Sequence, residues 1–237
     1  MAHTGGVLGS PGSSEKTDKS DQINQNISSI PTGPEGSVSI ALTGSGGSGV
    51  MTAGQMLLDA SAGAGYQGMM TRSLGPQIRG GEAAAFLRLS AHEVTCPGDG
   101  IDILISFDWA STERFSAEID LGPDSLVLFD PAAGDAPEMI LNTGAQLIDL
   151  PFKEMIAEIE GGRPNMLALG VVAGLIGLPE DAVLAIVAKA LKRKGPKALE
   201  ASSAGIRAGF GASAAMPATY RLGVGEKAGS RWNISGN

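Results

Sequence analysis

Residues 38–60 read VSIALTGSGGSGVMTAGQMLLDA and predict a strand, a glycine loop and a helix in that order. The apolar run Val38–Leu42 is typical of a buried strand, and the segment after the loop is amphipathic. Between them, Gly44, Gly46 and Gly49 satisfy the pattern G-x-G-x-x-G. The first glycine permits a tight turn, the second lets backbone approach a pyrophosphate, and the third lets helix and strand pack closely. This order predicts the first βα unit of a doubly wound sheet, with an anion site at the start of the helix.

Composition narrows the classes of partner. The chain has 237 residues and a net charge of −8, which argues against nucleic acid or an anionic membrane as the main partner. Cys96 is the only cysteine, so this chain alone cannot form an internal disulfide, an iron–sulfur cluster or a zinc site. The first 36 residues lack the apolar core of a signal peptide, and the longest apolar run, residues 166–178, is shorter than the roughly 20 residues that span a bilayer. We therefore expect a cytoplasmic protein with no nucleic-acid or membrane partner.

The rest of the chain divides into an N-terminal arm, an α/β portion and a helical portion. Residues 1–36 are rich in Gly, Ser, Asn and Lys and have few apolar positions, which predicts a flexible arm, with an arm that wraps a partner as the alternative. Further strands are predicted at residues 66–71, 83–89, 101–108, 125–130 and 145–150. Helices are predicted at residues 111–117, 152–159, 165–176, 180–194 and 197–209. The fold class is therefore α/β, a doubly wound, Rossmann-like and mostly parallel sheet with a helical C-terminal portion.

Two arginines follow the second predicted strand. A dinucleotide-binding protein would have an Asp or Glu here for a ribose hydroxyl, but the sequence has Thr71–Ser73, which counts against NAD. Arg72 suits a phosphate better than a ribose diol. Arg79 lies in a loop with Gly-Pro and Gly-Gly pairs, where it either clamps a carboxylate or phosphate or bonds loop carbonyls.

No catalytic or metal-binding set is predicted. Asp108 and Asp130 end two predicted strands, where turns or helix caps explain them better than acid catalysis. The only histidines are His3 and His92, so no Ser-His-Asp set or metal cluster can be assembled. The basic run in 189–194 is interpreted as the solvated end of a helix rather than a binding patch. The residues alone indicate an anion-binding domain without catalytic machinery of its own.

Three stretches in order carry a more specific resemblance: Gly44–Gly49 (GSGGSG), Thr71–Gly81 (TRSLGPQIRGG) and Pro164–Gly170 (PNMLALG). Together they resemble the gamma domain of the 2-oxoacid:acceptor (ferredoxin) oxidoreductases, over residues 37–212. The second stretch begins Thr-Arg-Ser-Leu-Gly-Pro, and this sequence is most similar to alpha subunits that carry the gamma domain fused at their N-terminus. Such subunits are typically those of 2-oxoglutarate:ferredoxin oxidoreductases.

The C-terminal residues extend the resemblance. Residues 218–222 resemble the interdomain linker of those alpha subunits, and residues 231–237 resemble the start of their thiamine pyrimidine-binding domain. The implied organisation is an arm (1–36), a gamma-type domain (37–212), and a linker with the start of a following domain (213–237). Because the sequence stops where that domain would begin, either the chain is cut there or its other half is a separate polypeptide.

The resemblance implies a reaction in which a 2-oxoacid, 2-oxoglutarate by the closest pattern, is decarboxylated oxidatively with coenzyme A. Acyl-CoA, CO2 and reduced ferredoxin are its products. Thiamine diphosphate, Mg²⁺ and a [4Fe-4S] cluster would belong to the remainder of the alpha subunit and an iron–sulfur beta subunit, and ferredoxin would accept the electrons. This chain would shape cofactor access and assembly without catalysing the reaction by itself.

The resemblance also indicates which residues would serve that role. The predicted contacts to a cofactor come from Gly44, Gly46, Gly47, Ser48, Arg72 and Arg79. Two other functions stay open: a free-standing nucleotide-binding oxidoreductase that uses the glycine loop alone, and a purely architectural module whose loop binds a protein segment.

Overall fold

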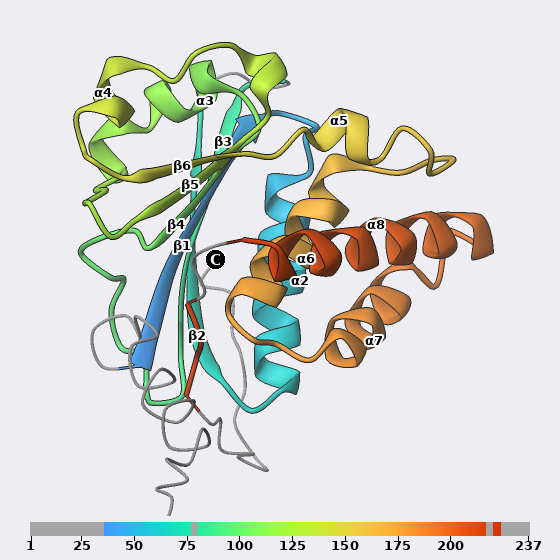
Figure 1. Ribbon diagram of the computed structural model, residues 1–237. Helices are drawn as coiled ribbons and strands as arrows, with labels where there is room; N and C mark the ends of the chain where they lie inside the picture. The colour runs from blue at the N-terminus through green and yellow to red at the C-terminus, as the bar shows by residue number, and fades with distance from the viewer. Residues whose placement is uncertain (1–35, 77–79, 217–219, 224–237) are drawn as a thin grey trace, which may run out of the picture. The chain divides into compact units, whose positions relative to one another are not determined.

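The computed structural model describes residues 36–76, 80–216 and 220–223, which build a six-stranded sheet with helices on both faces (Figure 1). The strands are β1 (Ser37–Ser45), β2 (Gln67–Leu74), β3 (Glu82–Ser90), β4 (Ile103–Ser106), β5 (Leu126–Phe129) and β6 (Gln146–Asp149). The helices are α2 (Val50–Gly63), α3 (Trp109–Arg114), α4 (Glu138–Leu141), α5 (Phe152–Met155), α6 (Pro164–Leu175), α7 (Glu180–Leu191) and α8 (Pro196–Ala214). The predicted arm up to residue 35 and the predicted domain start at 231–237 lie outside the described residues.

The sheet has the order β2-β3-β1-β4-β5-β6 and is mostly parallel. Strands β1, β4, β5 and β6 pair in parallel, with Ile40 opposite Ile103 and Ile103 opposite Leu126. Strand β3 pairs antiparallel with both β1 and β2, so it alone runs against the other strands. Residues 75–81 explain this reversal, because a parallel crossover needs about a dozen residues and a hairpin does not.

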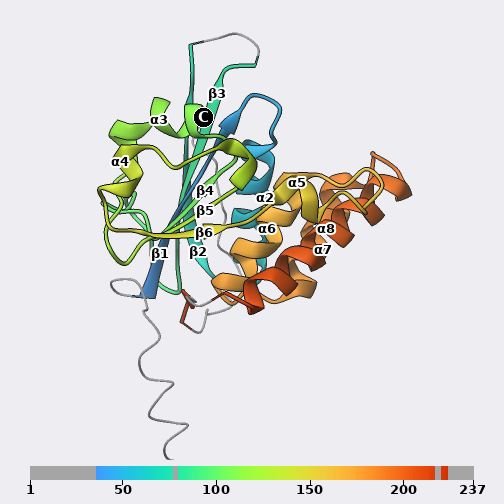
Figure 2. The ribbon, with the colours of Figure 1, turned by 45° about the horizontal axis from the view of Figure 1, so that its top comes forward.

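Side chains of successive strand residues go to opposite faces, and both faces are covered. Ile40 and Leu42 join the core beneath α2, α6, α7 and α8, whereas Ala41 joins a second core with Trp109 of α3 and Ile140 of α4. Figure 2 shows these two helical layers on either side of the sheet. Burial on both faces accounts for the near-continuous apolar runs of the central strands. The predicted α/β class with a helical C-terminal portion is confirmed.

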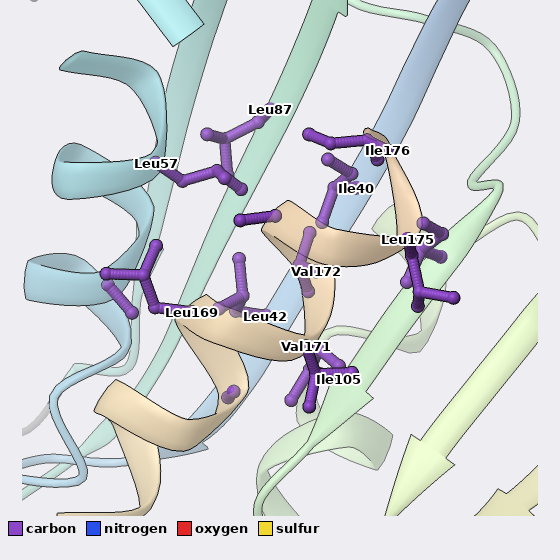
Figure 3. Packing of buried hydrophobic residues seen from close by; sticks show 14 of the residues in the cluster. Ile40, Leu42, Leu57, Leu87, Ile105, Leu169, Val171, Val172, Leu175 and Ile176 are labelled. Carbon is purple, nitrogen blue, oxygen red and sulfur yellow. The ribbon is translucent and has the colours of Figure 1, made fainter. Parts of the chain in front are cut away.

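The larger core is centred on α6, which lies directly on the sheet (Figure 3). Leu169 lies beside Leu42 of β1, and Val171 lies beside Ile105 of β4. These side chains are at most 1 % exposed. Because burying one such side chain contributes about 1.5–3 kcal/mol, this layer holds α6, and with it the start of α6, firmly against the sheet.

Glycines bring α6 and α8 into backbone contact. A Cβ added at Gly209 of α8 would lie 2.7 Å from the backbone nitrogen of Val171 and 2.9 Å from Cα of Gly170. A Cβ added at Gly170 would collide with the backbone of Ile206. The glycines of α6 and α8 therefore serve the packing of these two helices within the chain.

Several predicted helices have different ends in the structure. The helix predicted at 111–117 is α3 (Trp109–Arg114), and the helix predicted at 180–194 ends at Leu191. The helix predicted at 152–159 ends at Met155, because Ala157 and Ile159 bond to carbonyls three residues back and the chain tightens into turns. The helix predicted at 197–209 continues to Ala214. Its glycines are tolerated because close packing on α6 offsets their low helix propensity.

Candidate functional site

A cleft of about 1730 Å³ opens at the carboxyl ends of β1, β4 and β5. One side is formed by the glycine loop with the start of α2 and by residues 80–83 after the hairpin turn. The other side is formed by residues 158–166 and by the start of α8. This is the edge at which open α/β sheets bind ligands, and the cleft exceeds the roughly 300–1,000 Å³ of small-molecule pockets. Its size suits an extended ligand.

The glycine loop is a fixed turn. The N–H of Ser48 donates to the carbonyl of Ser45 at 3.0 Å, and the N–H of Ser45 donates to the carboxylate of Asp108 at 2.9 Å. Gly47 and Gly49 have φ of 97° and 87°, values that L side chains rarely adopt. The loop therefore needs glycine at both positions, and Asp108 ties it to the end of β4.

Gly46 lets the hairpin turn pack on the loop. A Cβ at Gly46 would lie 2.8 Å from Cα of Gly80 and 2.9 Å from the carbonyl oxygen of Gly81. Backbone thus lies directly on backbone, with no room for a side chain. The first and second stretches that carry the resemblance meet at this point.

Asn165 brings the third stretch to the same place. Its Nδ2 donates to the carbonyl oxygen of Gly49 at 3.2 Å, and the side chain is buried. Gly49 is the N-cap residue of α2, and Asn165 is the second residue of α6. This hydrogen bond joins the beginnings of two helices that lie 116 residues apart in the sequence.

Three long helices begin at the cleft. Val50 of α2, Pro164 of α6 and Lys197 of α8 line it, and none of these helices has a side-chain cap at its N-terminus. The first N–H groups of a helix lack intrahelical acceptors, and the helix dipole favours an anion there. Among the described residues, the N–H groups of Gly46 and Gly47 also bond to no acceptor. The cleft therefore offers several free backbone donors.

Charged side chains of both signs line the cleft. The cations are Lys153, Arg163, Lys194 and Lys197, and the acids are Glu82, Asp108, Asp130, Glu158, Glu160 and Glu200. Two of the acids are occupied as caps, because Asp108 accepts from Ser111 N at 2.7 Å and Asp130 accepts from Ala132 N at 3.0 Å. This confirms their interpretation as capping residues. Within the described part of the chain, the four cations form no ion pair.

A sequence profile of the pyruvate ferredoxin/flavodoxin oxidoreductase family matches residues 39–212. The chain belongs to this family. The match includes the glycine loop and the start of α6, and it ends within α8. Among curated proteins, the chain is similar to 2-oxoglutarate synthase subunit KorC of Archaeoglobus fulgidus, with 28% identity over 160 residues that cover 66% of this chain and 80% of that one.

Solved structures of family oxidoreductases share the fold. The 2-oxoglutarate:ferredoxin oxidoreductase from Magnetococcus marinus, solved with 2-oxoglutarate, coenzyme A and succinyl-CoA bound, matches 81% of this chain with a TM-score of 0.70 and 22% identity. This chain spans about a third of that protein, 34%. The gamma subunit of a keto/oxoacid ferredoxin oxidoreductase from Geobacter sulfurreducens matches with a TM-score of 0.60 and 23% identity, over 76% of this chain and 97% of that subunit.

The structure brings only some of the predicted contact residues to the cleft of this family member. Gly46, Gly47 and Ser48 line it, whereas Gly44 lies behind the loop and does not. The hydroxyl of Ser48 is buried and has no hydrogen-bond partner among the described residues, so Ser48 presents backbone rather than its hydroxyl. The guanidinium of Arg72 is exposed and donates to Gln55 of α2 at 2.8 Å, away from the cleft lining. Arg79 lies outside the described residues.

Sequence reasoning missed the far side of the cleft. The sequence pattern indicates no role for Asn165 within Pro164–Gly170, and it places Lys194 at the solvated end of a predicted helix. The signal for Asn165 was available, because a polar residue beside Pro164 opens an otherwise apolar helix. For Lys194 and Lys197 no local signal existed, since only the packing of α8 on α6 brings them opposite the glycine loop.

Metal-ligating side chains are not clustered in the described residues. No group of three or more His, Cys, Asp or Glu is placed to hold a metal ion in the ranges that the structure covers. His92 is exposed and does not line the cleft. None of the described helices is long and apolar enough to cross a membrane.

Proposed function

We propose that this chain is the gamma-type part of a 2-oxoacid:ferredoxin oxidoreductase that acts on 2-oxoglutarate, and that its cleft shapes the access of coenzyme A. The observation that carries the proposal is the meeting of three uncapped helix starts, the glycine loop and four unpaired cations at one cleft. Coenzyme A is an extended, phosphate-bearing molecule, and backbone N–H groups with lysine or arginine are the donors that phosphates favour.

The redox chemistry is assigned to partners of this chain. A [4Fe-4S] cluster needs four thiolates, and the sequence contains one cysteine, which is exposed. The single cysteine does not fit the cluster, and the described residues contain no group of three or more His, Cys, Asp or Glu placed to hold Mg²⁺. We assign the cluster, Mg²⁺ and thiamine diphosphate to the remainder of an alpha subunit and to an iron–sulfur beta subunit, in a cytoplasmic complex that reduces ferredoxin. The same proposal includes the domain boundaries, with an arm at residues 1–36, a gamma-type domain at 37–212 and a linker with the start of a following domain at 213–237.

The alternative of a free-standing NAD enzyme has less support, because no acid follows β2 to hold a ribose and Arg72 bonds to α2 instead.

The lysines across the cleft give a test in the assembled enzyme. We expect the double variant Lys194→Gln/Lys197→Gln to raise the KM for coenzyme A about tenfold, because charge-assisted contacts to phosphate are lost. The KM for the 2-oxoacid should not change. Steady-state assays of 2-oxoacid-dependent, CoA-dependent dye reduction measure both constants.

A matched control lies on α7 and at its end. Lys189→Gln/Lys192→Gln removes the same charge from two exposed lysines that do not line the cleft. We expect this control to leave the KM for coenzyme A within about twofold of wild type, since surface charges are screened by salt. Equal effects of the two double variants would contradict a role of the cleft and would indicate long-range attraction only.

A further inference from the structure

Residues 220–222, here called the clasp, return to the body of the protein after α8. Tyr220 and Leu222 are buried, at 5% and 8% exposure, and both belong to the larger core, whereas Arg221 between them is exposed. This alternation is that of an extended chain lying on an apolar surface.

Two hydrogen bonds fasten the clasp to different elements. The Leu222 N–H donates to the carbonyl oxygen of Ile176 at 3.1 Å. Ile176 is the C-cap residue of α6, whose last carbonyls have no partners within the helix, so the clasp caps this helix from outside. The Tyr220 hydroxyl donates to the carbonyl oxygen of Asp124, immediately before β5.

The chemistry of Tyr220 keeps it a donor. Burial, and secondly the carboxylates of Asp102 and Asp124, raise the pKa of Tyr220 to about 12. The phenol is therefore protonated throughout the physiological range. Its hydrogen bond to a carbonyl needs that proton.

The clasp lies at the end of the molecule opposite the cleft. Helix α6 begins at the cleft with Pro164 and ends beside the clasp, and its 12 residues span about 18 Å. Asp124 precedes β5, whereas Asp130 follows β5 and lines the cleft. Figure 1 shows the described red segment, residues 220–223, near the beginning of β1.

We propose that the clasp is the attachment that fixes where the chain leaves this unit: Tyr220 and Leu222 pin it to the amino edge of the sheet, and the ligand cleft stays at the carboxyl edge. The occupant of this surface is the chain's own segment after α8. The clasp thus fixes the position of residue 223 on this unit. The inference rests on contacts within this chain and does not depend on the proposed function.

Limited proteolysis of the full chain tests the clasp at one bond. Trypsin can cut after Arg221 only when Leu222 leaves its bond to Ile176, and mass spectrometry identifies this cut. Tyr220→Phe removes one hydrogen bond and should speed cleavage at Arg221 about two- to tenfold. Tyr220→Ala also removes the buried ring and should speed it by on the order of a hundredfold.

Two controls separate release of the clasp from unfolding. Tyr66→Phe changes the chain's other tyrosine, which is only half-buried, and should leave the rate at Arg221 unchanged. Cleavage after Arg207, within α8, requires local unfolding of that helix and should stay slow in Tyr220→Phe. Equal rates of cleavage at Arg221 in the wild type, Tyr220→Phe and Tyr220→Ala would overturn the proposal.

A distance measurement tests the positioning role directly. In a Cys96→Ser background, spin labels at Gly223→Cys and Lys189→Cys measure the distance between the end of the clasp and α7. Position 223 is exposed and has room for a side chain. We expect a narrow distance distribution that broadens when Tyr220 is replaced by Ala. A distribution equally broad with Tyr220 present would contradict a fixed exit.

Discussion

Replacing Gly209 by alanine should lower the free energy of unfolding by at least about 2 kcal/mol, because overpacking of a closed interface forces backbone shifts. The added Cβ would collide with the carbonyl oxygen of Leu167 and lie 2.7 Å from the nitrogen of Val171. Both obstacles are backbone atoms of α6, which is itself fixed on the sheet and cannot move aside. Alanine has the better helix propensity by about 1 kcal/mol, so the observed loss is net of that gain.

Gly211 provides the matched control two residues further along α8. It is exposed, and a Cβ there meets no atom within 4 Å. Gly211→Ala should therefore raise the free energy of unfolding by about 0.5–1 kcal/mol. Urea denaturation of the two variants measures the contrast. Two variants of equal stability would show that α6 and α8 are not in backbone contact.

The second large effect is expected at Gly49, where conformation and space both require glycine. Gly49→Ala should cost about 3 kcal/mol or more, since an L residue at φ 87° loses about 1–2 kcal/mol and the new Cβ would lie 2.6 Å from Cγ of Asn165. At Gly47, where φ is 97°, an added Cβ meets no atom within 4 Å. Gly47→Ala should therefore lower the free energy of unfolding only by the roughly 1–2 kcal/mol of backbone strain.

A double-mutant cycle separates the collision from the strain. Asn165→Ala alone should cost about 1–2 kcal/mol, because it removes a buried hydrogen bond to Gly49. Combined with Gly49→Ala it should cost less than the sum of the two, because the alanine then has room. Additive losses in denaturation experiments would mean that Asn165 does not pack on the glycine loop.

Local patterns were sufficient for the elements that position the site. The apolar run, glycine loop and amphipathic segment at 38–60 predicted β1, the loop and the start of α2, and the buried runs predicted β4 and β5. The reversal of β3 was also readable in principle, because residues 75–81 are too few for a parallel crossover. The position of Arg72 was readable too, since strand alternation places it with Met70 on the α2 side of β2.

The far side of the cleft depends on tertiary packing and has no local signature. Lys194 belongs to a basic run at the end of the helix predicted at 180–194, and that position explains the run without any contact with the cleft. The contact of Gly46 with Gly80 joins residues of two loops, and that of Asn165 with Gly49 spans 116 residues. Such contacts follow from how α6 and α8 pack, which no short-range periodicity encodes.

The most direct test of the central claim is to purify the chain with its partners under gentle, oxygen-free conditions and to assay the complex. The account predicts a brown complex containing a cysteine-rich partner, with reduction of ferredoxin that requires both 2-oxoglutarate and coenzyme A. The Lys194→Gln/Lys197→Gln variant of that complex should still require coenzyme A but need a higher concentration of it, as a raised KM for coenzyme A with the KM for 2-oxoglutarate unchanged. A colourless protein that purifies alone, or a complex whose activity is indifferent to coenzyme A, would contradict the account.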